Sequence, residues 1–144
     1  MSQNYRIEVL NWQSEMQAKL KAIREEVFIV EQHVPLYIEW DEFDETAIHL
    51  LALDDNEQAI GCARILTDKG RIGRMGVLKV WRGHGVGYAL LDKAIAICKA
   101  HHIEKISLSS QTHAIAFYQK AGFVVTSEAY IDANIWHVDM QLEV

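Results

Sequence analysis

A glycine-rich turn between an expected strand and an expected helix constrains this chain more than any other stretch. The turn is Arg82–Gly87, with the sequence Arg-Gly-His-Gly-Val-Gly; residues 71–80 before it have the pattern of a strand, and residues 86–100 after it that of a helix. Seven of the eight glycines lie between positions 61 and 87. Glycine lets a backbone approach a ligand closely, and the first N–H groups of a helix are unpaired at the positive end of its dipole. The turn therefore predicts a phosphate-bearing ligand at residues 82–87.

The glycine spacing does not match two well-known nucleotide-binding motifs. A dinucleotide fingerprint needs three differently spaced glycines and an acidic residue at the end of the next strand, but the next expected strand, Ile106–Ser109, has no acidic residue. A phosphate-loop NTPase needs Gly-Lys-Ser or Gly-Lys-Thr, whereas this turn ends in Gly87-Tyr88-Ala89. Taken by itself, the turn fits a tight connection without a ligand equally well.

The order of the expected elements indicates an α+β fold with a mixed sheet. The helix at 86–100 connects two strands, 71–80 and 105–109, and a helical crossover of this kind makes its two strands parallel. Short turns join the other neighbours, which are expected to be antiparallel. Further strands are expected at 5–10, 48–53, 59–66, 123–126 and 135–142, and further helices at 16–30 and 114–121.

Two glycines interrupt the expected strand at 71–80. Gly73 and Gly76 weaken a strand, because they bring no side chain to pack and cost backbone entropy. Such positions often mark a bulge or the close approach of a ligand. We expect one of these features in the strand before the turn.

An acidic and aromatic segment at 35–47 precedes the central strands. We expect it to be a solvated loop or a short helix, and the alternative is the wall of a pocket that holds an amine. The side chains that could attract a cation here and just before this segment are Glu31, Glu39, Asp41 and Asp44.

Length and composition limit the classes of function. A chain of 144 residues with one proline suits a single domain, 1–144, with one core and no linkers. A net charge of −6 disfavours nucleic acid as a partner and mildly favours a cationic substrate. No apolar run is long enough to span a membrane, and the N-terminus has no secretory pattern. Cys62 and Cys98 lie in apolar stretches and the histidines lack zinc-type spacing, so a cytoplasmic protein without a metal site is expected.

Two motifs together resemble the GNAT superfamily of acyl-CoA-dependent N-acyltransferases. Arg82–Gly87 meets the signature Arg/Gln-x-x-Gly-x-Gly/Ala, and Ala116–Phe123 looks like the segment Phe-Tyr-x-x-x-Gly-Phe. Residues of the N-terminal half resemble the small bacterial ElaA-type branch: Arg24, 27–32, Pro35, Glu39, Asp41, Asp44 and His49. Near the C-terminus, Asn134–His137 keeps the isoleucine and histidine of that branch's Gly-Ile-Pro-His-like stretch but replaces its glycine and proline. The resemblance covers nearly the whole chain.

The resemblance implies a GNAT-like, mostly antiparallel sheet of about seven strands with a splayed central parallel pair and about four helices. Acetyl-CoA would be the co-substrate, with its pantetheine arm between the splayed strands. The matching residues expected to bind it are Met75, Gly76, Val77, Arg82, Gly83, His84, Gly85, Val86, Gly87, Tyr88 and Gln111. A homodimer formed through the C-terminal strands is also implied.

Tyr118 matches the tyrosine that the family is thought to use to protonate the departing thiolate. The ordinary pKa values of a thiol and a phenol make full proton donation unfavourable by about 2 kcal/mol, so a hydrogen bond that strengthens as charge develops is the better description. On helical spacing alone, Tyr118 would be read as a core aromatic. The transfer itself would be direct attack by an amine, with a backbone N–H near Val77 stabilising the oxyanion.

The general base is less well defined. In other GNAT branches a glutamate serves from positions corresponding to Arg71 or Ile106, neither of which is acidic here. The candidates are Glu39, Asp41, Asp44, His49, His113 and His137, or a water that they hold. We favour His137, because histidine titrates near neutrality and the final hairpin borders the expected acceptor side. A packed, hydrogen-bonded strand histidine is the alternative.

Three functions follow from these expectations. The first is an acetyl-CoA-dependent N-acetyltransferase that acts on a small-molecule or peptide amine. The second is a CoA-binding sensor or interaction module without transfer activity, which the absence of the familiar glutamates favours. The third is acetyl transfer to a hydroxyl group.

Overall fold

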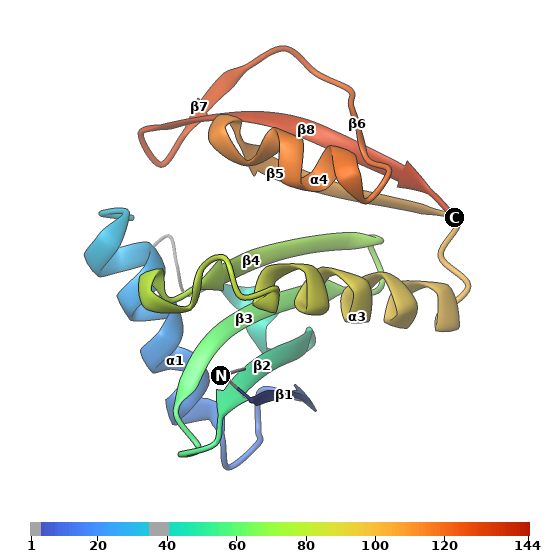
Figure 1. Ribbon diagram of the computed structural model, residues 1–144. Helices are drawn as coiled ribbons and strands as arrows, with labels where there is room; N and C mark the ends of the chain where they lie inside the picture. Colours follow the sequence, from blue (N-terminus) through green and yellow to red (C-terminus); the bar gives the residue numbers. More distant parts are fainter. Residues whose placement is uncertain (1–3, 35–40) are drawn as a thin grey trace.

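The computed structural model describes residues 4–34 and 41–144 and contains one mixed sheet of eight strands in the order β1-β2-β3-β4-β5-β8-β6, with β7 paired to β8 (Figure 1). The strands are β1 Tyr5–Leu10, β2 Ile48–Asp54, β3 Ala59–Leu66, β4 Arg71–Val77, β5 Lys105–Gln111, β6 Val124–Val125, β7 Tyr130–Asp132 and β8 Ile135–Glu143. All pairs are antiparallel except β4 with β5. The expected mixed, mostly antiparallel sheet is confirmed, with one additional short strand, β7.

Three α-helices flank the sheet in the described part of the chain: α1 Gln17–Arg24, α3 Val86–Ala100 and α4 Ile115–Lys120. A π-helical segment, η1 Glu25–Glu31, continues α1, so the helix expected at 16–30 is present but changes its hydrogen-bonding pattern halfway. Short 3₁₀ turns are η2 Glu42–Glu45, η3 Lys79–Trp81 and η4 Thr112–Ala114.

The central parallel strands β4 and β5 separate almost as soon as they meet. Their ladder contains one residue pair, Arg71 with Ser107, held by a hydrogen bond from Ser107 N–H to Gly70 O at 2.9 Å. By contrast, β5 pairs with β8 over the whole of Lys105–Gln111. In Figure 1 the ribbons of β4 (green) and β5 (orange) diverge from this point. The expected splayed pair is therefore present.

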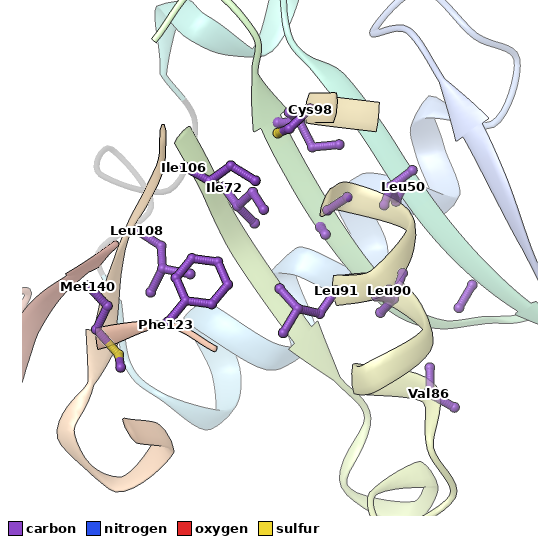
Figure 2. Close-up of a cluster of buried hydrophobic side chains, with 14 of the residues drawn as sticks. Leu50, Ile72, Val86, Leu90, Leu91, Cys98, Ile106, Leu108, Phe123 and Met140 are labelled. Atoms are coloured by element: carbon purple, nitrogen blue, oxygen red, sulfur yellow. The ribbon is translucent and has the colours of Figure 1, made fainter. Parts of the chain in front are cut away.

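Two apolar cores cover opposite faces of the sheet. On one face, Leu90 and Leu91 of α3 pack with Ile72, Ile106 and other side chains of the sheet, as Figure 2 shows. On the other face, α1 and η1 pack against β2 and β3 through a second set of buried side chains: Leu20, Ile23, Val27, Phe28, Leu51, Leu53 and Cys62. Alternation along the strands then determines which side chains face α3 and which face away from it.

A β-bulge occupies the middle of β4. Cys62 of β3 lies opposite Gly76 and Arg64 lies opposite Gly73, so β4 has one extra residue in this interval. Arg74 within the bulge has a positive φ of 48°. At Gly76 a Cβ would lie 2.7 Å from Val27 Cγ1, so the close approach is made by η1. The bulge predicted for the glycines of this strand is found, and the group that approaches Gly76 closely is a helix of the chain itself.

Three arginines hold two aspartates behind the bulge. Arg24 Nη1 donates to Asp44 Oδ1 at 2.7 Å, Arg64 Nη1 donates to Asp41 Oδ1 at 2.6 Å, and Arg74 Nη2 donates to Asp41 Oδ2 at 3.1 Å. Burial opposes ionisation of Asp44. The hydrogen bond and charge of Arg24, together with hydrogen bonds from the Asp41 backbone and Arg64, outweigh this effect and lower the pKa of the carboxyl below 3.8. These two carboxylates are therefore bound to arginines rather than available to attract a cation.

A buried histidine next to this network makes folding sensitive to pH. Burial lowers the pKa of His49 below the ordinary value of 6.5, and its Nε2–H donates to Asp44 O at 2.9 Å. Below pH 6.5, His49 becomes protonated in the unfolded chain but stays neutral in the folded chain. The free energy of unfolding is therefore highest above this pH and falls as the pH drops toward the pKa of His49 in the folded protein.

We therefore expect His49→Gln to remove a pH-dependent part of the stability. The difference in unfolding free energy between wild type and variant should be constant above pH 6.5 and change below it by at most about 1.4 kcal/mol per pH unit. Urea unfolding across this range measures it, with the exposed His101→Gln as control. Equal slopes for wild type and both variants would contradict the assignment.

Candidate active site

A cleft of about 960 Å³ opens where β4 and β5 part. Its described lining comes from β4, β5 and η1, from the turn before α3, from α4, and from the β7–β8 hairpin. Of the residues expected from the sequence to bind the co-substrate or to catalyse transfer, all but His84 line this cleft: Met75, Gly76, Val77, Arg82, Gly83, Gly85, Val86, Gly87, Tyr88, Gln111, Tyr118 and His137. The structure thus brings the two sequence motifs to one site.

The glycine turn presents an unobstructed backbone at the N-terminus of α3. Gly83 and Gly85 have φ values of 83° and 82°, and a Cβ on either would meet no atom within 4 Å. Gly85 is the N-cap residue, and its carbonyl accepts the first helical hydrogen bond, from Ala89 N–H at 3.0 Å. The preceding N–H groups of the first turn have no helical acceptor and point out at the positive end of a helix of 15 residues. This arrangement suits an anion such as a diphosphate.

The first turn of α3 packs directly on α4. A Cβ on Gly87 would lie 3.3 Å from the ring of Phe117, and the rings of Tyr88 and Phe117 have centroids 4.5 Å apart. Glycine at this position therefore allows the two helices to approach closely. The contact also fixes Tyr118, the next residue of α4, relative to the glycine turn.

Arg82 joins the turn to its surroundings. Its Nε donates to Val77 O at 3.1 Å, and its Nη2 donates to Glu31 Oε2 at 2.7 Å. The turn is thereby tied both to the end of β4 and to the end of η1. Glu31 is thus a third carboxylate that pairs with an arginine instead of remaining free for a cation.

The Tyr118 hydroxyl lies at the cleft in an apolar environment. Its Oη is 3.8 Å from Met75 Sδ, and its ring packs edge to face against Phe117 and Phe123. Burial raises the pKa of Tyr118 to about 12. Compared with a thiol of ordinary pKa, full donation of this proton is unfavourable by about 5 kcal/mol, so the hydroxyl keeps its proton and acts as a hydrogen-bond donor.

His137 lies on the opposite face of the sheet, and its ring is oriented by its own strand. Its Nδ1 lies 2.7 Å from Ile135 O and must carry a hydrogen to make this bond, so Nε2 keeps its lone pair. The ring stacks on Tyr130 at a centroid distance of 6.1 Å. Gln111 lies directly opposite His137 in the β5–β8 ladder. In the neutral ring, Nε2 is therefore the nitrogen that carries a lone pair, and the residue lines the cleft.

Sequence reasoning predicted Gln111 but missed its partner Gln32 and also Ser109, two other polar residues that line the cleft. Gln111 Nε2 donates to Gln32 Oε1 at 2.7 Å, a contact that links β5 to the residue after η1. Ser109 Oγ lies 2.5 Å from Tyr130 Oη, which donates to Asp139 Oδ1 at 2.6 Å. The alternation of β5 and β8 was visible in the sequence, but the partner of each polar side chain depends on a pairing between distant strands.

The structure separates the candidates for the general base. His49 and Asp44 are buried away from the cleft, and Asp41 is bound to two arginines. Glu39 lies outside the described residues, and Ile106 is fully buried in the core. His113 and His137 both line the cleft.

His84, which was expected to contact the co-substrate, lies outside the cleft lining. Its ring packs against Trp81 with centroids 5.6 Å apart. The imidazole is therefore not part of the described cleft wall, whereas the backbone N–H of His84 belongs to the glycine turn.

Residues 4–34 and 41–144 lack both a metal-ligand cluster and a membrane-spanning helix. No group of three or more histidine, cysteine, aspartate or glutamate side chains is arranged to hold a metal ion. No helix in this part of the chain is long and apolar enough to cross a membrane.

The fold and cleft are those of an acyl-CoA-dependent acyltransferase: a splayed parallel pair with a glycine turn and a helix N-terminus at one end. The acetyltransferase (GNAT) domain family matches residues 12–144, and the chain belongs to this family.

The ElaA-type resemblance is also confirmed by the comparisons. Protein ElaA of Escherichia coli is 34% identical over 132 residues, which cover 87% of this chain and 86% of ElaA. Its crystal structure matches with a TM-score of 0.84 at 30% identity, over 97% of this chain and 100% of ElaA. An acyl-CoA N-acyltransferase from Pseudomonas aeruginosa matches with a TM-score of 0.80 at 32% identity, over 97% and 99% of the two chains.

Proposed function

We propose that the protein is an acetyl-CoA-dependent N-acetyltransferase that transfers the acetyl group directly to a primary amine in a ternary complex. The observation that carries this proposal is a single cleft lined from both faces of the sheet. The glycine turn and Tyr118 line it on the side of α3, and His137 lines it on the other side. A donor and an acceptor that enter from opposite faces can meet between β4 and β5.

The residues present fit acetyl-CoA. The glycine turn would hold the diphosphate through backbone N–H groups, and the pantetheine arm would lie along β4, whose ladder with β5 ends after Arg71. When bound, acetyl-CoA supplies an activated thioester. The N–H groups near Val77 would stabilise the charge on the carbonyl oxygen, and Tyr118 would donate a hydrogen bond to the departing sulfur.

His137 is the proposed proton acceptor. An amine must lose a proton during the attack. His137 lines the cleft and its Nδ1 is occupied by Ile135 O, so Nε2 would be the nitrogen that accepts this proton. No carboxylate stands at Arg71 or Ile106, the positions of glutamate bases in other branches. His113 is the second histidine on the cleft wall and is the natural comparison.

We expect His137→Gln to lower kcat about tenfold to a hundredfold at neutral pH, while the Kd of acetyl-CoA stays unchanged. Steady-state rates and calorimetric titration with acetyl-CoA measure the two quantities, and His113→Gln is the matched control. If His113→Gln shows the larger loss, His137 is not the base.

An acetyl-transfer screen tests the function itself. Purified protein is incubated with acetyl-CoA and a panel of amines of different size and charge, and release of free thiol is followed. Mass spectrometry then separates an amide from an ester, which identifies transfer to a hydroxyl. Tight binding of acetyl-CoA without transfer to any acceptor would instead support a CoA-binding module.

The C-terminal strands support a homodimer as part of this proposal. Exposed apolar side chains gather on β6, β7 and β8: Val124, Val125, Ile131 and Trp136. A cytoplasmic location is proposed as well, because Cys62 and Cys98 are separate buried thiols and form no disulfide.

A further inference from the structure

The cleft has the opposite charge balance from the chain. The chain carries a net charge of −6, yet the described cleft lining contains four arginines and two carboxylates. The arginines are Arg64, Arg71, Arg74 and Arg82, and the carboxylates are Glu31 and Asp132. The described lining is therefore not the acidic surface that would attract a cationic acceptor.

Three of these four arginines are already engaged. Arg82 binds Glu31, and both Arg64 and Arg74 bind Asp41. Arg71 is different: within residues 4–34 and 41–144 its guanidinium has neither an ion pair nor a hydrogen bond, although the residue is partly buried on the cleft wall. A partly buried cation without a partner is costly, and a bound anion would remove that cost.

Strand alternation places Arg71 on the acceptor side. Ile72 packs in the core under α3, so Arg71 and Gly73 face the other side of the sheet. Ser109 and His137 also face that side, because Leu108 and Val138 point into the same core as Ile72. The positive charge of Arg71 acts on the nearby Tyr130 hydroxyl and opposes the rise in its pKa that burial and Asp139 cause.

The part of the cleft next to Arg71, at Gly73 of β4, is not filled by protein atoms. A Cβ on Gly73 would meet no atom within 4 Å, so the space directly above this residue of β4 is unfilled. Ser109 lies on β5, across the cleft from Gly73, and adds a hydroxyl group to the lining. Together these residues form a small polar subsite at the closed end of the cleft, away from the glycine turn.

We propose that the acceptor is an amine that also carries a carboxylate, and that Arg71 binds this carboxylate. This inference rests on the proposed transferase function and names the class of its acceptor. One unengaged guanidinium balances a single negative charge and matches the two oxygens of a carboxylate. A phosphate dianion would need more cationic groups than the one that remains available.

The test compares amino acids with their own amides. Glycine, 4-aminobutyrate and 6-aminohexanoate are each assayed beside the corresponding primary amide, together with putrescine and 3-aminopropyl phosphate. We expect kcat/KM for at least one acid to exceed that for its amide about tenfold or more. Arg71→Gln should abolish this preference by raising KM for the acid much more than for the amide, and Arg71→Lys should restore part of it. Arg6→Gln, which removes an arginine from β1, is the matched control.

A binding measurement keeps the inference separate from catalysis. NMR shifts of the Gly73 and Ser109 amides are followed as each acid or amide is added to the protein with CoA. Acid-specific shifts that Arg71→Gln removes support the subsite even if no amine is acetylated, in which case only the proposed function fails. Acetylation without any preference for an acid, or with a preference for putrescine or the phosphate, overturns the inference and leaves the function standing.

Discussion

Replacing Tyr118 by phenylalanine is expected to lower kcat about a hundredfold or more, with little change in the Kd of acetyl-CoA. The hydroxyl sits among apolar groups, 3.8 Å from Met75 Sδ, and the pKa of about 12 keeps it protonated. Its hydrogen bond therefore gains most when negative charge develops on the departing sulfur. Single-turnover rates and calorimetric titration with acetyl-CoA measure the two quantities.

The packing of Tyr118 allows its hydroxyl to be removed without disturbing the ring contacts. Its ring contacts Phe117 and Phe123 edge to face, and phenylalanine preserves both contacts. Urea unfolding should accordingly give nearly the same free energy for the two proteins. A variant that folds normally and turns over at the wild-type rate would remove Tyr118 from the mechanism.

Gly85→Val is expected to weaken binding of acetyl-CoA about a hundredfold. Valine at a φ of 82° is strained by about 1–3 kcal/mol, so the turn must change its backbone path and lose the outward aim of its N–H groups. The new side chain would also project into space that is now empty within 4 Å, where the diphosphate is expected. Calorimetric titration measures the loss.

Gly122→Ala separates this effect from backbone strain in general. Gly122 also has a positive φ, 102°, but a Cβ there would press on Leu142 rather than face the cleft. This variant should lose stability and keep its affinity for acetyl-CoA. If Gly85→Val bound acetyl-CoA normally, the diphosphate would have to lie elsewhere.

The sequence was sufficient for the elements with strong periodicity and for both motifs. The apolar stripe of α3 predicted its bounds, Val86–Ala100, and the crossover rule predicted the parallel pair that forms the cleft. The glycines of β4 indicated the bulge. These features are local, because each depends on spacing within one segment or on the order of neighbouring segments.

Features that depend on distant partners were not predictable. The acidic segment gave no sign that Asp41 and Asp44 would meet arginines from α1, β3 and β4. Arg71 was noted only as a position without a glutamate. Its lack of an ion pair or hydrogen bond among the described residues could be found only from the structure. Strand β7 was missed because it has three residues, and Ala133 in its turn has a positive φ of 49°, which alanine seldom adopts.

The single residue pair between β4 and β5 also affects how rigid the molecule is. The sheet has two parts, β1–β4 and β5–β8, which are joined by one backbone residue pair and by apolar side-chain contacts. Such contacts keep the two parts together without fixing their relative orientation. The pantetheine arm, which has its own amide groups, would supply hydrogen bonds in place of those that β4 and β5 do not make with each other. Binding of acetyl-CoA would thereby make the molecule more rigid. Without it, the two parts of the sheet would move relative to each other at the β4–β5 junction.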